Sequence, residues 1–226
     1  MPRPWLTVVA ALLLIVSVSE LDAQALPGDL IQSAVFAGTQ PIDLCHLPGT
    51  NDLYVLDASN GSTYRYDLTN LAAGPNLTIS NPVGTAATTG ITSDGFFLYF
   101  AVTGHAQTFW RTDLLGGSAT ALGSISLPGF GSLVGICLDS AGNLWANDVT
   151  NDTYSKHSIA DGSYLGVSFP HPDGSGSGSG LAFRSDCELF EIPHGGVGAG
   201  RVTALTSVLG PDGVPIDGID VSAIGP

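Results

Sequence analysis

The polar residues best suited to chemistry occur mainly in segments that follow a strand-like stretch, where loops present side chains to solvent. This set comprises Asp57, His105, Asn147, Asp148, Asp152, His194 and Asp217. Carboxylate and amide oxygens are the ligands that a hard divalent cation prefers. If this set holds a metal, Asp57 and Asp148 are the candidate ligands and Ca²⁺ is the candidate ion. No other cofactor is expected.

Two histidines of this set, His105 and His194, are also the candidate catalytic bases. Neither is accompanied by a Gly-x-Ser-x-Gly sequence or by another nucleophile context. The glycine-rich runs at 174–180 and 195–200 do not open a helix after a strand, so they do not predict a phosphate-binding loop. The sequence therefore identifies no catalytic residue, and it leaves enzymatic activity uncertain while favouring a protein that is not an enzyme.

Basic residues are rare, and four of them recur at one place in an internal repeat: Arg65, Arg111, Lys156 and Arg201. Arranged around a ring, they could bind an anion. The favoured interpretation is structural: each pairs with a carboxylate of its own or the adjacent repeat, a contact worth about 0–1 kcal/mol when exposed.

Acids recur as well, at Asp94, Asp139 and Asp186, next to Gly, Ser or Asn residues. Three acids around a ring could hold a metal. Aspartate also accepts hydrogen bonds from the backbone of its own turn, and this turn role is the favoured interpretation.

The elements that position these residues are repeats of about 45 residues. Their clearest marker is a Leu followed by an aromatic residue, at Leu53, Leu98, Leu144 and Leu189. A Gly-Ile or Gly-Leu pair precedes the last three leucines, starting at Gly90, Gly135 and Gly180, and Leu44-Cys45 is matched to it in the first repeat.

Alternation and turn residues divide each repeat into four short strands. In the third repeat they are expected at 133–139, 144–149, 153–159 and 164–169. Four antiparallel strands per repeat, with no helical period, predict an all-β fold, a β-propeller of about four blades. The ring could be closed, or the chain could be a fragment of a larger propeller. The segment around Gly218-Ile219 could open a fifth blade or supply a closing outer strand, a role that residues 30–36 could also fill.

One stretch, GICLDSAGNLWANDVTNDTYSKHSIADG, resembles a blade of the NHL and gluconolactonase-type propeller superfamily. The shared features are the Gly-Ile opening, the Asp-x-x-Gly-Asn-Leu hairpin and the acid four residues after the Leu, Asp148, which Asp57 matches in the first repeat. The resemblance implies a propeller whose members are scaffolds, lactonases or lyases. Gluconolactonase-type enzymes hold one divalent cation with oxygen ligands, but this chain lacks their full Glu/Asn/Asn/Asp set in a recognisable context.

The N-terminus has the pattern of a secretory signal peptide: Arg3, an apolar run at 5–18, and Ala23-Gln24-Ala25. We expect residues 1–25 to be removed and residues 26–226 to form the propeller domain. The apolar run is shorter than the roughly 20 residues that span a bilayer, so no membrane span is expected. The protein should be secreted, in the extracellular space or the periplasm.

The chain has a formal net charge of −14 at pH 7. Such a charge repels phosphate backbones, so nucleic acid is excluded as a partner. The three cysteines, Cys45, Cys137 and Cys187, cannot all pair with one another. The function expected from the sequence is an exported binding or scaffold module for an unknown extracellular ligand or protein. The alternative is a divalent-cation-dependent, lactonase-like hydrolase or a lyase.

Overall fold

The computed structural model describes residues 36–38, 40–47, 49–57, 59–84, 88–104, 108–122, 132–151 and 153–170, and the backbone of strands at 178–183, 189–193, 202–209 and 215–224. These residues form four antiparallel sheets of four strands each, in which the strands follow one another in chain order. The four sheets predicted from the repeat are thereby confirmed.

The first sheet contains β1 (Pro41–His46), β2 (Asp52–Asp57), β3 (Ser62–Asp67) and β4 (Leu77–Ser80). The second contains β5 (Thr88–Ser93), β6 (Phe97–Val102), β7 (Phe109–Asp113) and β8 (Thr120–Leu122). The third contains β9 (Leu133–Leu138), β10 (Leu144–Asp148), β11 (Thr153–His157) and β12 (Tyr164–Pro170). The fourth contains β13 (Gly178–Phe183), β14 (Leu189–Pro193), β15 (Val202–Leu209) and β16 (Pro215–Ile224).

Helical structure is almost absent. Among the described residues it is limited to one short 3₁₀ turn, Leu71–Ala73. In the same residues, no helix has the length and apolar character needed to cross a membrane. The C-terminal segment around Gly218-Ile219 lies in β16. This strand is the outer strand of the fourth sheet, so the segment forms an outer strand and does not open a fifth blade.

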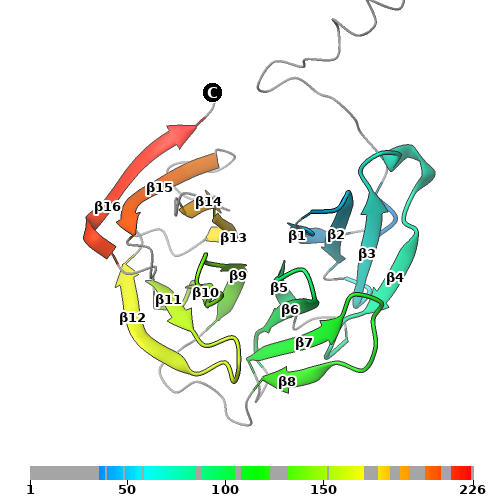
Figure 1. The fold of residues 1–226 in the computed structure, drawn as a ribbon, viewed down its shortest axis with the longest axis horizontal. Coiled ribbons are helices and arrows are strands. Elements are labelled where there is room, and N and C mark those ends of the chain that lie inside the picture. Colours follow the sequence, from blue (N-terminus) through cyan, green and yellow to red (C-terminus); the bar gives the residue numbers. More distant parts are fainter. Residues whose placement is uncertain are drawn as a thin grey trace, which may run out of the picture. The chain divides into compact units, whose positions relative to one another are not determined.

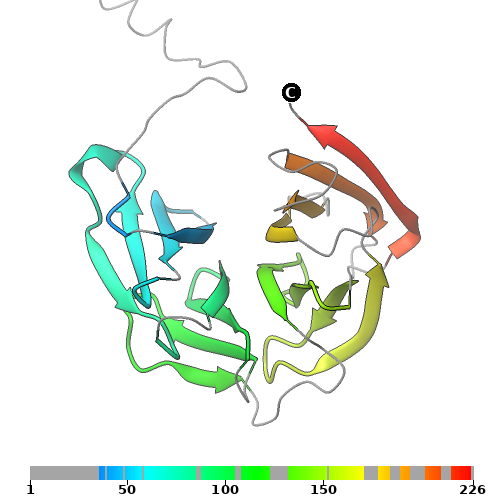
Figure 2. The ribbon, with the colours of Figure 1, turned by 180° about the vertical axis from the view of Figure 1, so that it is seen from behind.

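The first strand of each sheet is its inner strand (Figures 1 and 2). β1 contacts β5, β5 contacts β9 and β9 contacts β13, while β13 also lies beside β1. This is the arrangement of propeller blades around an axis, as the sequence predicted.

Register between strands corrects one match made from the sequence. Cys45, Thr92, Cys137 and Ala182 are each paired with the aromatic residue that follows the marker leucine. The residues two positions before these four are Asp43, Gly90, Gly135 and Gly180. In the first sheet, the equivalent of Gly90-Ile91 is therefore Asp43-Leu44 and not Leu44-Cys45. The match was wrong because the turn after β1 is longer than the turn after β5, which residue counting from the leucine does not reveal.

The core lies between the sheets. One cluster packs Cys45, Tyr54 and Leu56 of the first sheet against Ile91 and Phe100 of the second. Another packs Tyr99 and Phe109 of the second sheet against Ile136, Leu144 and Ala146 of the third. The second sheet thus uses one face for the first sheet and the other for the third.

Burial of the marker leucines follows from this stacking. Leu98 and Leu144 are fully buried, whereas Leu53 is only half-buried. The expected burial is therefore confirmed at two positions and wrong in degree at Leu53, because no described sheet packs on that side of the first sheet. The side chain of Leu189 lies outside the described residues.

We expect Leu98→Ala to lower the free energy of unfolding by about 2–5 kcal/mol, because it empties a fully buried site between two sheets. Leu115→Ala is the matched control, since Leu115 is exposed and its truncation should change stability by no more than about 0.5 kcal/mol. Urea denaturation measures both values. Equal effects of the two substitutions would contradict the packing described here.

Candidate functional site

Asp57 and Asp148 are the last residues of β2 and β10, at equivalent places in the first and third sheets. Each is opposite the first residue of the next strand, Ser62 or Thr153. Both side chains are fully buried. The turns that follow share the pattern Asp-x-Ser/Thr-Asn.

The Asp57 carboxylate is bound by its own turn. Its Oδ1 accepts hydrogen bonds from the backbone N–H of Ser59 at 2.7 Å, the Ser59 hydroxyl at 2.6 Å and the backbone N–H of Asn60 at 3.3 Å. Gly38 packs so closely on the other oxygen that a Cβ there would collide with Oδ2. Both oxygens therefore face protein atoms.

The Asp148 carboxylate is held in the same way. Its Oδ1 accepts from the backbone N–H of Thr150 at 3.0 Å and of Asn151 at 3.2 Å, and its Oδ2 accepts from the Asn151 side-chain amide at 2.7 Å. These contacts are those of an aspartate that stabilises its own turn. Through these hydrogen bonds, the two candidate metal ligands stabilise the turns that follow β2 and β10.

The other predicted site residues are placed less completely. Asn147 is buried on β10, on the opposite face of the strand from Asp148. Asp217 lies on β16 by its backbone. His105, Asp152 and His194 lie outside the described residues. The part of the chain that the structure describes contains no group of three or more His, Cys, Asp or Glu side chains suited to a metal ion.

Three of the four recurring basic residues occupy equivalent places on third strands. Arg65, Arg111 and Lys156 pair in register with the aromatic residues Tyr54, Tyr99 and Trp145. The equivalence predicted from the repeat is confirmed for these three, and Arg201 lies outside the described residues.

Each of these basic side chains contacts its own sheet. Arg65 lies 3.6 Å from Asp52, and Lys156 lies 3.1 Å from Asp139. The Arg111 guanidinium lies over the Phe97 ring, 4.9 Å from its centroid. Contacts within single sheets support a structural role and give no indication of a shared anion site.

The recurring acids Asp94 and Asp139 act in turns. The Asp94 carboxylate accepts from the backbone N–H groups of Phe96 and Phe97 and from the Tyr99 hydroxyl, all at 2.8 Å. Asp139 is similar, accepting from the Asn143 backbone and from the Trp145 indole N–H at 3.0 Å. Burial alone would raise the pKa of Asp139, but these donors and Lys156 hold it below its usual value. Asp186 lies outside the described residues.

Two polar features were missed by the sequence analysis. One is Asp43, on the inner strand β1, where the second, third and fourth sheets have glycine. Its Oδ2 accepts from the backbone N–H of Ile91 in the second sheet at 2.9 Å. Part of the side chain reaches solvent, yet the surrounding strands desolvate the carboxyl group and raise its pKa to about 8. Correct register alignment would have found it as the one acid among glycines.

The second is a hydrogen bond of 2.8 Å between the Ser155 hydroxyl and Nε2 of His157. Both side chains are fully buried on β11, and the His157 ring lies 4.9 Å from that of Phe109. A serine nucleophile must meet its substrate, so this buried pair is structural. Their spacing of two residues was visible in the sequence, but their burial was not.

Most of the exposed large apolar side chains of the described residues lie at one end of the sheets. We call this end the hairpin face: the turns joining first to second and third to fourth strands. Phe96 is 78% exposed in the turn before β6, and Leu115 is 74% exposed in the turn after β7. Tyr164 and Leu165, also exposed, begin β12. The opposite end, the connection face, carries the turns after Asp57 and Asp148.

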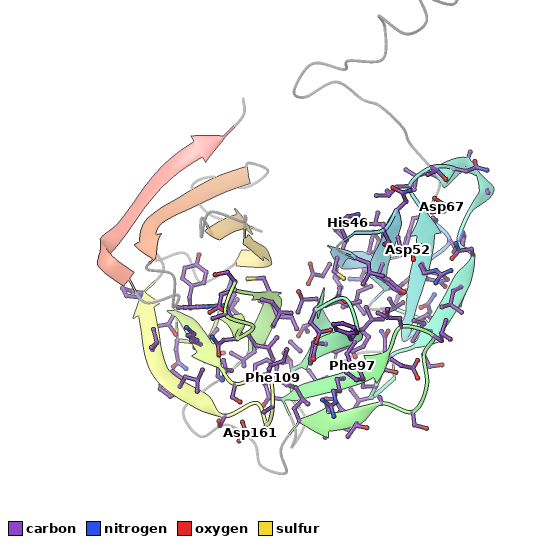
Figure 3. All side chains as sticks on the ribbon, viewed as in Figure 1. His46, Asp52, Asp67, Phe97, Phe109 and Asp161 are labelled. Atoms are coloured by element: carbon purple, nitrogen blue, oxygen red, sulfur yellow. The ribbon has the colours of Figure 1, made fainter. Side chains whose placement is uncertain are left out.

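The hairpin face is also acidic. Asp67, Asp113 and Asp161 occupy its turns in three successive sheets, and Figure 3 labels the first and last of them. Hydrogen bonds from the turns lower the pKa of each, chiefly from Thr69, Gly117 and Ser163 respectively. These carboxylates are therefore ionised at neutral pH, beside exposed apolar side chains.

Comparisons with solved structures support the fold. The chain is similar to a chain of a nidogen/laminin complex, with 18% identity, a TM-score of 0.51, and coverage of 76% of this chain and 61% of that one. It is similar to Myxococcus xanthus glutaminyl cyclase, with 16% identity, a TM-score of 0.54, and coverage of 73% and 65%. It is also similar to Kuenenia stuttgartiensis hydrazine synthase, with 14% identity, a TM-score of 0.54, and coverage of 88% and 53%.

These neighbours are β-propellers, and at such identities the likeness concerns the fold alone. The matched region spans less than two thirds of each neighbour's length. No protein-family model matches the chain. No curated protein sequence matches it either.

The buried His157 predicts a pH dependence of stability. Burial lowers its pKa from 6.5 to about 4, so between these values the unfolded chain binds a proton that the folded chain does not. The free energy of unfolding should therefore fall as the pH decreases from 6.5 to about 4, by about 2–3 kcal/mol from this group. His157→Gln should remove that component, which urea denaturation at successive pH values would measure.

The matched control is His46→Gln, which changes an exposed histidine. The raised pKa of Asp43 gives the opposite dependence of stability on pH, since the stability from that group falls as the pH rises from 3.8 toward about 8. Asp43 is present in both the wild type and His157→Gln, so its contribution cancels when the two pH profiles are compared. Identical pH profiles for wild type and His157→Gln would contradict the assignment.

Proposed function

We propose that the protein is an exported, non-catalytic β-propeller module that binds another protein through its hairpin face. The observation that carries this proposal is the exposure of Phe96, in the turn between β5 and β6, and of Leu115, in the turn between β7 and β8. Because Phe97 pairs with Asp113, these two exposed side chains belong to the same end of the β6–β7 hairpin. A few buried anchors near the centre of an interface, often aromatic, supply most of its binding energy.

The surrounding charge indicates the chemistry of the partner. Ionised Asp67, Asp113 and Asp161 would attract a basic surface, accelerate its association and disfavour acidic partners. A partner with an apolar patch bordered by Lys or Arg therefore complements this face. The resemblance to NHL and gluconolactonase-type blades is compatible with this role, since scaffolds are among the functions of that superfamily.

Export is part of the proposal and is supported by the sequence pattern at residues 1–25. The connection face, which the sequence favoured for ligand binding, is a weaker candidate. Its two described carboxylates are already engaged by backbone and side-chain donors. The hairpin-face side chains, by contrast, are exposed to solvent.

The direct test is selection of random peptides on the immobilised protein, followed by affinity measurement. We expect enriched peptides to combine aromatic or aliphatic residues with Lys or Arg. Phe96→Asp should weaken their binding at least about tenfold, because it removes the apolar anchor. The matched control, Asn60→Asp, adds the same charge at an exposed turn of the connection face. Peptides that respond to the control and not to Phe96→Asp would refute the hairpin face as the site.

A second test concerns the cation-dependent hydrolase. If the connection-face carboxylates serve the turns, calorimetric titration with Ca²⁺ at about 0.15 M salt should show only weak, non-saturating heats. Asp148→Asn, which preserves the shape of the side chain, should leave those heats unchanged. A saturable site abolished by this substitution would favour the metalloenzyme and contradict our proposal.

A further inference from the structure

The first sheet has a face that no described sheet covers. We call it the open face: the side that points away from the second sheet. Strand register places two rows of residues on it, one of Leu44, Val55 and Tyr64 and the other of His46, Leu53 and Tyr66. Most of these side chains are apolar or aromatic.

The same register positions are interfaces in the next two sheets. Leu44 is 60% exposed, whereas its counterparts Ile91 and Ile136 are each 1% exposed. The counterparts of Val55 are Phe100 and Ala146, and both are fully buried against the preceding sheet. The open face therefore has the residue composition of a contact between sheets, but no described sheet packs on it.

Part of the open face is covered by the chain just before β1. The Phe36 ring lies 5.4 Å from that of Tyr64 and 6.4 Å from that of Tyr66. The backbone N–H of Ala37 donates to the Tyr66 hydroxyl at 2.8 Å. Phe36 and Ala37 thus contact the third strand, β3, and they leave Leu44 of the inner strand β1 exposed.

The fourth sheet of the same chain does not complete the cover. β13 lies beside β1, yet Leu44 remains exposed. In the other interfaces the second strand also contacts the next inner strand: β2 with β5, β6 with β9 and β10 with β13. Among the described strands, β14 makes no comparable contact with β1.

The chemistry of the missing partner follows from the existing interfaces. The face that packs on Ile91 presents Tyr54 and Leu56, and the face that packs on Ile136 presents Tyr99 and Ala101. In the fourth sheet the same register positions hold Phe190 and Ile192. No described sheet follows the fourth one, so the chain has both halves of one further interface.

We propose that the open face packs on the fourth sheet of a second copy of this chain, so that β1 lies beside the partner's β13 in place of its own. Two copies then make two identical contacts related by a two-fold axis, and neither half of the interface is left over. Burial of Leu44, Leu53 and Val55 drives the association. The net negative charge of each copy opposes it, so added salt should tighten the dimer by screening the repulsion.

The test is sedimentation equilibrium of the exported protein at about 100 μM and at two salt concentrations, about 0.05 and 0.5 M. We expect a dimer that is tighter at the higher salt. Leu44→Asp should weaken it at least about tenfold without lowering the free energy of unfolding of the single copy, because Leu44 is exposed there. Leu115→Asp is the matched control and should leave the dimer intact, since it adds the same charge on the hairpin face.

A complementation experiment tests the second half of the interface. Ile192→Asp should also weaken the dimer, and a mixture of Leu44→Asp and Ile192→Asp copies should regain association through one intact contact. A monomeric wild type, or a dimer that tolerates Leu44→Asp, would overturn the proposal. Either result would assign the open face to the chain's own fourth sheet or to a different protein. Peptide binding at the hairpin face is unaffected by Leu44→Asp, so the two proposals fail separately.

Discussion

The structure depends on one constraint: a four-stranded sheet with apolar side chains on both faces cannot bury either face alone. Tyr54 and Leu56 line one side of the first sheet, and Leu98 and Phe100 meet them from the second. Burial of such side chains contributes roughly 1.5–3 kcal/mol each relative to exposure. Stacking of successive sheets supplies that burial, and the propeller arrangement follows from it. In the first sheet, Leu44 lies on a side that no described sheet covers, and it is exposed to solvent.

The stacking also determines what the recurrent polar residues do. Each sheet leaves its turns at two ends, and aspartates at those turns satisfy backbone N–H groups that the strands do not pair. Asp57 and Asp148 do this on the connection face, and Asp94 and Asp139 do it on the hairpin face. Acids that look like a ring of metal ligands in the sequence are therefore local to their turns. What distinguishes the hairpin face is the set of apolar side chains that no turn requires, above all Phe96 and Leu115.

Much of the fold could be predicted from the sequence, because the marker leucines and the basic residues keep one period and alternation defines the strands. The equivalence of Asp57 with Asp148, and of Arg65 with Arg111 and Lys156, followed from that period. The half-exposure of Leu53 could not be predicted, since it depends on whether a neighbouring sheet is present. The position of Asp43 required the true register, which a longer turn concealed. The exposure of Phe96 could not be read from its type, because half-buried Phe97 follows directly as the first residue of β6.

The central claim is that the connection-face carboxylates serve their turns, which leaves function to the exposed surfaces. Residue-resolved amide hydrogen exchange with and without Ca²⁺ tests it most directly, because Ser59 and Thr150 donate their backbone N–H groups to Asp57 and Asp148. We predict slow exchange at both amides, with rates and chemical shifts that do not respond to Ca²⁺. Fast exchange that becomes slow as Ca²⁺ saturates would show carboxylates organised by a cation, and would contradict the account.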